Sequence, residues 1–270
     1  MTKIDVKKSK HHKGSEIMGK IICIANQKGG VGKSSVTCNL GAALTLEGKS
    51  VLLIDIDSQC SLTMSLGYQP EKFETSSVTI LDTPAKCPMC IYETDIDGLS
   101  IIPANSMLST LEMSLYNKKD NNLRLRKALE KVKEIFDYIL IDCSPALSLS
   151  TINALVAADY VLIPAETKVS SNFSLNTFIS TVNTVKSVMN ENIEILGVIA
   201  TMYYCQANED KEVLQHLQDN YEVLGVIRRT TAVSSSFGLG KPCVLTSRRS
   251  LATKEFKEIA KKIIDKVEVK

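Results

Sequence analysis

The segment that most constrains this 270-residue chain reads KGGVGKSS and occupies residues 28–35. It follows a short apolar run and precedes a stretch with helical spacing. A glycine-rich loop between a buried strand and a helix lets backbone N–H groups surround phosphate oxygens, and the helix adds its positive dipole end. The segment therefore predicts a nucleotide-phosphate site. The residues expected to contact the nucleotide are Lys28, Gly29, Gly30, Val31, Gly32, Lys33, Ser34 and Ser35.

Within this segment, Lys33 is expected to neutralise the β- and γ-phosphates and Ser34 to offer its hydroxyl to Mg²⁺. Asp142 ends an apolar run, which suits a carboxylate that holds Mg²⁺ through water. Asp55 and Asp57 end another apolar run, and the carboxyl ends of parallel strands meet at a ligand crevice. We expect Asp57 to orient the attacking water. The alternative is that these aspartates only cap turns.

Apolar runs alternate with helical spacing along the chain, which predicts a single-domain α/β P-loop NTPase. Its sheet should be mostly parallel and doubly wound, with helices on both faces. The expected strands are residues 21–25, 51–54, 99–102, 138–141, 160–163, 195–200 and 223–227. The expected helices are residues 34–46, 123–136, 152–157, 173–189, 209–220 and 251–267.

Residues 1–18 are rich in lysine and lack apolar periodicity, so we expect a basic, disordered tail before a domain that spans residues 19–270. No apolar run approaches the roughly 18 residues that a membrane span needs. The lysine-rich start does not have the pattern of a secretory signal, so the expected location is the cytoplasm.

The net charge is only +2, but it is unevenly distributed. Residues 1–20 and 228–270 are basic, and the stretch between them is acidic. Basic ends on an acidic body favour a polyanionic partner. Two solvated lysine-rich surfaces are the alternative.

The chain contains eight cysteines, most of them single in apolar surroundings. Without a secretory signal they are expected to be reduced thiols. Cys87 and Cys90 have the spacing of metal ligands, but a metal or Fe–S site needs further ligands from elsewhere. The favoured interpretation is a loop with incidental thiols.

The motifs together resemble the ParA/Soj branch of the ParA–MinD ATPases, over about residues 20–264. Lys28, the extra lysine before the glycines, makes the phosphate loop a deviant Walker A motif. The other matching segments are Asn26-Gln27, residues 51–59, residues 138–145, residues 151–159, Ser236-Phe237-Gly238 and Lys241-Pro242.

The resemblance implies an ATPase that uses ATP and Mg²⁺ and forms an ATP-sandwich homodimer. Lys28 would reach the partner subunit's nucleotide, Asp57 would position water, and Asp55 and Pro145 would lie near the nucleotide. The dimer would bind double-stranded DNA without sequence preference, on the nucleoid and not on a membrane. A ParB-like protein would stimulate hydrolysis and release. The candidate DNA contacts are Arg248, Arg249, Lys254 and Lys257.

The sequence departs from the family pattern at several positions. Three departures, which concern turnover, are Ser58 for Pro, Cys60-Ser61 for Gly-Asn, and Ser144 for the first Pro of the second switch. Two more, which concern recognition of the base, are Gln206-Ala207 for Arg-Thr and Arg228 for Pro.

Three alternatives remain within the superfamily. A MinD-like ATPase that cycles on membranes would need the amphipathic last helix to be free for lipid. An Fe–S scaffold or reductase would need cysteine pairs at the dimer interface. A weakly hydrolysing regulator would use ATP only as a switch for dimerisation.

Overall fold

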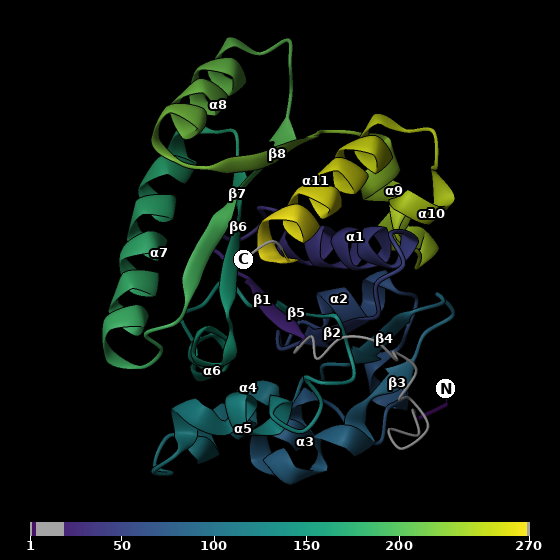
Figure 1. Cartoon of the computed structure of the whole chain (residues 1–270), viewed down its shortest axis with the longest axis vertical. Coiled ribbons are helices and arrows are strands. Elements are labelled where there is room, and N and C mark those ends of the chain that lie inside the picture. The colour runs from purple at the N-terminus through teal and green to yellow at the C-terminus, as the bar shows by residue number, and fades with distance from the viewer. Residues whose placement is uncertain (1, 4–18, 269–270) are drawn as a thin grey trace.

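The computed structural model describes residues 2–3 and 19–268, so the predicted basic tail lies almost entirely outside the described residues. An eight-stranded sheet crosses the molecule in the order β3-β4-β2-β5-β1-β6-β7-β8 (Figure 1). The strands are β1 Lys20–Ile24, β2 Val51–Asp55, β3 Tyr92–Glu93, β4 Leu99–Ile102, β5 Tyr138–Asp142, β6 Tyr160–Glu166, β7 Glu194–Tyr203 and β8 Val223–Arg228.

Helices cover both faces of the sheet (Figure 1). The α-helices are α1 Lys33–Leu46, α2 Ser61–Ser65, α3 Ser77–Asp82, α4 Leu108–Leu115, α5 Arg124–Leu129, α6 Leu149–Ala157, α7 Val169–Val188, α8 Asn208–Asn220, α9 Thr231–Leu239, α10 Cys243–Thr246 and α11 Leu251–Glu268. The short 3₁₀ helices are η1 Pro70–Lys72, η2 Pro84–Cys90 and η3 Asn121–Leu123.

Two hydrophobic cores lie on opposite faces of this sheet. Successive side chains of a strand point to opposite faces, so Ile21 and Cys23 of β1 join one core while Ile22 and Ile24 join the other. The first core contains residues of α3 to α8, and the second contains residues of α1, α2, α10 and α11. All strand pairs are parallel except β3 with β4. The predicted doubly wound, mostly parallel sheet is confirmed.

The helix expected over residues 123–136 is much shorter. Its α-helical part, α5, ends at Leu129. The Lys133 carbonyl accepts a hydrogen bond from the Gly19 N–H, and the Asp137 N–H donates to the Ser50 carbonyl. In a continued helix, the Asp137 N–H would donate to the Lys133 carbonyl. Here both groups bond instead to residues just before β1 and β2, so the helix cannot continue through residue 137. Helices α4, α9 and α10 were not predicted, and α7 begins four residues before the expected start.

Helix α11 packs on β8 and α1 through an apolar face. Phe256, Ile259, Ile263 and Val267 on this face are at most 1% exposed. The membrane-cycling alternative needs this face to be free, and here it is part of the core. None of the helices within residues 19–268 offers the length of apolar sequence that a membrane crossing requires.

The strand register brings two predicted site residues together. Asp55 at the end of β2 pairs directly with Asp142 at the end of β5, and Asp142 also pairs with Ile24 at the end of β1. The phosphate loop follows Ile24. The sheet therefore delivers both carboxylates and the loop to one edge.

Candidate nucleotide site

The phosphate loop connects β1 to α1 and leaves open space in front of its glycines. A Cβ atom placed on Gly29 or Gly30 would meet no other atom within 4 Å. Gly32 caps α1 with φ 87°, in the left-handed region where a side chain costs about 1–2 kcal/mol. The first turn of α1 contains no acidic residue, so the positive end of the helix faces the loop uncompensated. The loop is thus shaped and charged for an anion.

Lys33 extends back along this loop. Its Nζ donates a hydrogen bond of 3.0 Å to the Lys28 carbonyl. Burial lowers the pKa of Lys33, and the nearby Asp142 carboxylate opposes that shift. The ammonium group therefore lies at the loop with a carboxylate as its nearby countercharge.

Asp142 is fully buried and only partly satisfied. Its Oδ1 accepts a hydrogen bond of 3.1 Å from the Thr37 hydroxyl, while Oδ2 has no partner within residues 2–3 and 19–268. Burial, together with the charge of Asp55, raises the pKa of Asp142 well above its usual range, and the Ser34 hydroxyl opposes the shift. A buried carboxylate oxygen without a partner is costly unless a cation or its bound water satisfies it. Ser34 and Asp142 are thus a suitable donor set for Mg²⁺, which prefers oxygen ligands.

Asp55 and Asp57 both stabilise the turn that follows β2. Asp55 accepts hydrogen bonds from the Thr63 N–H at 2.8 Å, the Thr63 hydroxyl at 2.7 Å and the Asp57 N–H at 3.1 Å. Burial raises the pKa of Asp55 to about 6. Asp57 is 8% exposed, and its Oδ1 accepts from the Gln59 N–H at 3.0 Å. Asp55 and Asp57 therefore do cap the turn after β2, as the alternative interpretation of these aspartates expects.

Cys60, one of the departures from the family pattern, lies in the same turn with φ 56°. Only glycine adopts this left-handed conformation without strain. The backbone here keeps the shape that suits the glycine usual in the family, and the cysteine carries the strain.

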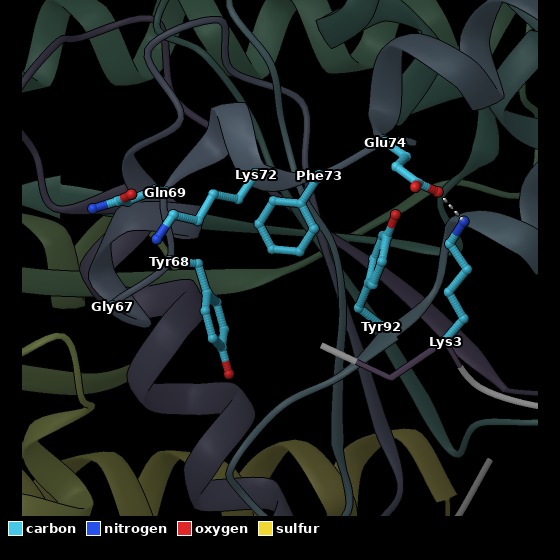
Figure 2. Close-up of a pocket in the computed structure, with 8 residues that line it drawn as sticks. All are labelled: Lys3, Gly67, Tyr68, Gln69, Lys72, Phe73, Glu74 and Tyr92. Carbon is cyan, nitrogen blue, oxygen red and sulfur yellow. Dashed lines mark hydrogen bonds and ion pairs between the residues drawn. The ribbon is translucent and has the colours of Figure 1, made fainter.

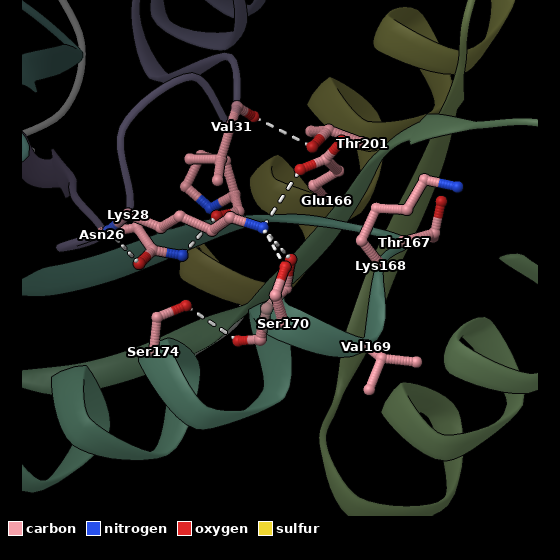
Figure 3. A network of polar contacts seen from close by, with 12 residues as sticks. Asn26, Lys28, Val31, Glu166, Thr167, Lys168, Val169, Ser170, Ser174 and Thr201 are labelled. Carbon is pink, nitrogen blue, oxygen red and sulfur yellow. Dashed lines mark hydrogen bonds and ion pairs between the residues drawn. The ribbon is translucent and has the colours of Figure 1, made fainter. Parts of the chain in front are cut away.

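Lys28 does not point into the phosphate loop but toward the start of α7 (Figure 3). Its Nζ donates to Glu166 Oε2 at 3.1 Å and to the hydroxyls of Ser170 and Ser171, both at 2.9 Å. The lysine and glutamate side chains are 24% and 26% exposed. All three ammonium protons thus have partners within the same subunit. No motif in the sequence marks any of these three partners.

A pocket of about 870 Å³ adjoins the phosphate loop. One wall is formed by Gly32, Ser35 and Val36, and the opposite wall comes from the ends of β7 and β8 and from α9. Its size suits a nucleoside. Arg228, another departure from the family pattern, lines the pocket, and its guanidinium lies 3.4 Å from the Glu255 carboxylate. Gln206 and Ala207 do not line it.

The four predicted DNA contacts lie close together around the start of α11. Arg248, Arg249 and Lys254 are exposed, and Lys257 is half-buried. The Thr253 hydroxyl is hydrogen-bonded to the carbonyls of Ser247 at 2.9 Å and Cys243 at 3.2 Å. The loop that carries both arginines is therefore attached to α11.

Pro145 is exposed in the turn between β5 and α6. The neighbouring Ser144 hydroxyl donates to the Ala146 carbonyl at 3.2 Å, so the serine adds a polar contact inside this turn.

Cys87 and Cys90 are buried in η2, and burial raises the pKa of both thiols. Within residues 2–3 and 19–268, no three Cys, His, Asp or Glu side chains are grouped to hold a metal. Both thiols are therefore protonated, buried side chains rather than exposed thiolates.

A second pocket of about 500 Å³ lies beyond the end of α2 (Figure 2). Tyr68, Phe73 and Tyr92 form an aromatic wall with edge-on ring contacts. Lys3 pairs with Glu74 at 3.1 Å and lies 5.7 Å from the centre of the Tyr92 ring. No motif had pointed to this pocket.

Sequence reasoning also missed two threonines that support the acidic residues. Thr37 follows Lys33 by one helical turn, so its spacing could have indicated a second polar group facing Asp142. Thr63 could not have been found this way, because its contact with Asp55 depends on how α2 folds back onto β2.

Comparisons with known proteins agree with this geometry. A family model described as an AAA domain matches residues 19–195. The sporulation initiation inhibitor protein Soj of Bacillus subtilis is 38% identical over 249 residues, covering 91% of this chain and 98% of Soj. The chromosome partitioning protein ParA of Caulobacter vibrioides is 34% identical over 254 residues, covering 92% and 94%. This chain belongs to the ParA/Soj family of ATPases.

A solved structure extends the comparison to the fold. Cobyrinic acid a,c-diamide synthase from Mycobacterium smegmatis, with a bound ATP analog and magnesium, superposes with a TM-score of 0.79. It is 30% identical and covers 92% of this chain and 95% of its own. The predicted family and fold class are confirmed. The protein is a P-loop ATPase of the ParA/Soj family, and its nucleotide and ion are ATP and Mg²⁺.

The raised pKa of Asp142 predicts a pH-dependent gain in stability for Asp142→Asn. Without nucleotide and Mg²⁺, the folded protein binds the proton of Asp142 more tightly than the unfolded chain, because burial and the charge of Asp55 raise the pKa of this carboxyl in the folded state. The folded protein therefore loses stability as pH rises toward the raised pKa. Asparagine does not titrate, so the variant should be more stable than wild type, by about 1 kcal/mol or more at pH 8 and by less at pH 5.

Urea unfolding at both pH values, without Mg²⁺, measures this difference. Addition of Mg²⁺ and ATP should then stabilise wild type more than the variant. An advantage of equal size at pH 5 and pH 8 would contradict the account of Asp142.

Proposed function

We propose that this protein is an ATP-dependent DNA-partitioning ATPase whose ATP-bound homodimer binds DNA without sequence preference. The observation that carries the proposal is the group of exposed basic residues at Arg248, Arg249 and Lys254 on an ATPase of the ParA/Soj family. Phosphate contacts need only such side chains, arrayed on one face, and carry no sequence information. The acidic middle of the chain would help to orient the basic face toward DNA.

The proposed chemistry divides among the residues of the phosphate edge. Residues 28–35 bind the phosphates, Lys33 neutralises their charge, and Ser34 and Asp142 hold Mg²⁺. Asp57 orients the attacking water with the carboxylate oxygen that does not accept the Gln59 N–H. Mg²⁺ supplies charge neutralisation at the phosphates when bound.

The proposed homodimer gives Lys28 its role. In one subunit Lys28 is held by Glu166, Ser170 and Ser171, so it must leave this network to reach the partner subunit's nucleotide. There its charge would meet the negative charge that develops during phosphoryl transfer. The same stretch of α7 presents Val169 and Phe173, which are 64% and 81% exposed and would be covered in a dimer.

Hydrolysis would return the protein to a state that releases DNA. We infer that a ParB-like protein stimulates this step and that the protein resides on the nucleoid. The support is the similarity to ParA of Caulobacter vibrioides, a chromosome partitioning protein.

A random-sequence duplex tests the DNA proposal. Binding should require ATP with Mg²⁺, be weak with ADP or without nucleotide, and fall as salt rises. Arg249→Ala and Lys254→Ala should each lower the slope of log affinity against log salt by about 1, because each removes one phosphate contact.

Lys211→Ala, an exposed lysine on α8, is the matched control and should leave the slope unchanged. Absence of binding in every nucleotide state would overturn the proposal. ATP-driven dimerisation without hydrolysis would instead favour the switch-regulator alternative.

The dimer proposal predicts that Glu166→Gln strengthens ATP-dependent dimerisation. A partly exposed ion pair contributes about 1 kcal/mol, and a homodimer opens one pair in each subunit, so loosening both should tighten the dimer by roughly thirtyfold. Analytical ultracentrifugation with ATP and Mg²⁺ measures this constant. Glu209→Gln, which loosens the neighbouring pair with Lys168, is the control and should have no effect. An unchanged dimer with unchanged ATP affinity would show that Glu166 does not restrain Lys28.

A further inference from the structure

The turn after α2 and the end of α9 approach each other closely at two glycines. Gly67 follows α2 with φ 81°, and Gly240 ends α9 with φ 62°. A Cβ atom on Gly240 would lie 2.5 Å from the Gly67 Cα and 2.9 Å from its nitrogen. A Cβ atom on Gly67 would lie 3.1 Å from the Gly240 carbonyl oxygen. No side chain fits between the two glycines, so a movement of one segment toward the other displaces it.

On one side, this contact leads directly to the hydrolytic residues. Thr63 of α2 donates both its N–H and its hydroxyl to Asp55 Oδ2, and Asp55 Oδ1 accepts the N–H of Asp57. The Gly67 N–H donates to the Met64 carbonyl, which continues the turn from α2. The position of α2 and Gly67 is therefore tied to the carboxylates beside the phosphate loop.

On the other side, the contact leads to the basic residues. Gly240 precedes Lys241 and α10, which is followed by the loop with Arg248 and Arg249. The Thr253 hydroxyl bonds to the carbonyls of Cys243 and Ser247, so α10 and this loop are held together. A displacement of Gly240 thus reaches the proposed DNA surface through short, hydrogen-bonded segments.

We propose that Gly67 and Gly240 are positioning residues that couple the γ-phosphate state of the nucleotide to the orientation of the basic loop. The inference rests on the proposed DNA-binding function and gives it a route through the fold. A second route connects the phosphate loop to the basic loop through α1, because the Asn39 side chain of α1 accepts the Val244 N–H of α10 at 3.3 Å. The experiment must therefore separate the glycine contact from the path through α1.

Gly240→Ala separates the two, with Gly48→Ala as the matched control. Gly48 also ends a helix and has φ 80°, but a Cβ there would meet no other atom within 4 Å. Both substitutions strain the backbone, and only Gly240→Ala forces α2 and α9 apart. The first readout is hydrogen–deuterium exchange of residues 58–68 and 240–250, comparing ADP with a non-hydrolysable ATP analogue, both with Mg²⁺.

In wild type and Gly48→Ala, the analogue should change exchange in both segments. In Gly240→Ala, the change at residues 58–66 should persist, while that at residues 241–250 should shrink by about fivefold or more. An equal change at 241–250 in all three proteins, or none in wild type, would overturn the coupling. If Gly240→Ala does not fold, the same exchange measurement on Gly67→Ala and wild type tests the coupling, with the same expected loss of the change at residues 241–250.

The second readout is ATP-dependent affinity for a random duplex, which should fall by about five- to tenfold in Gly240→Ala and stay unchanged in Gly48→Ala. Because the exchange measurement contains no DNA, the two proposals can fail separately. A wild-type protein that never binds DNA would overturn the proposed function, while the exchange data would still judge the coupling.

Discussion

The burial of Asp142 is the constraint on which the rest of the site depends. The register of β1, β5 and β2 places this carboxylate beside Asp55 at the edge where the phosphate loop begins, and its Oδ2 has no partner among the described residues. Two buried carboxylates side by side disfavour each other's charge, so the edge is best stabilised by the cations that it binds. Lys33 supplies one positive charge from within the chain, and Mg²⁺ supplies the other.

The positive charge already at the phosphate loop explains why the Lys28 ammonium is held away from it. A second free ammonium at the loop would partly occupy the place of the cation and the phosphates. Its three hydrogen bonds, to the end of β6 and the start of α7, hold it near the loop with every ammonium proton bonded. In the proposed dimer, Lys28 leaves these three partners only when the partner subunit's nucleotide offers stronger acceptors. This exchange links dimer assembly to hydrolysis.

Much of this arrangement could be predicted because parallel strands end at one edge. The apolar runs before Asp55 and Asp142 were sufficient to bring both residues to the phosphate loop. The partners of Lys28 were not predictable, because they depend on β6 lying beside β1 and on α7 starting four residues earlier than its apolar spacing indicates. The contact between Gly67 and Gly240 joins residues far apart in the chain, and nothing in their local sequence marks it. The helix expected beyond Leu129 does not reach Phe136 for a similar reason, since the Lys133 carbonyl and the Asp137 N–H bond to residues beside distant strand starts.

The central claim is that Lys28 acts on the nucleotide of the partner subunit. Mixing Lys28→Ala with Asp57→Ala tests it most directly, because each variant alone should be nearly inactive in ATP hydrolysis. In an equal mixture about half the dimers are mixed, and each of these has one complete site, so roughly one quarter of the wild-type rate should return. A mixture that stays as inactive as its two components, while mixed dimers form, would contradict the account.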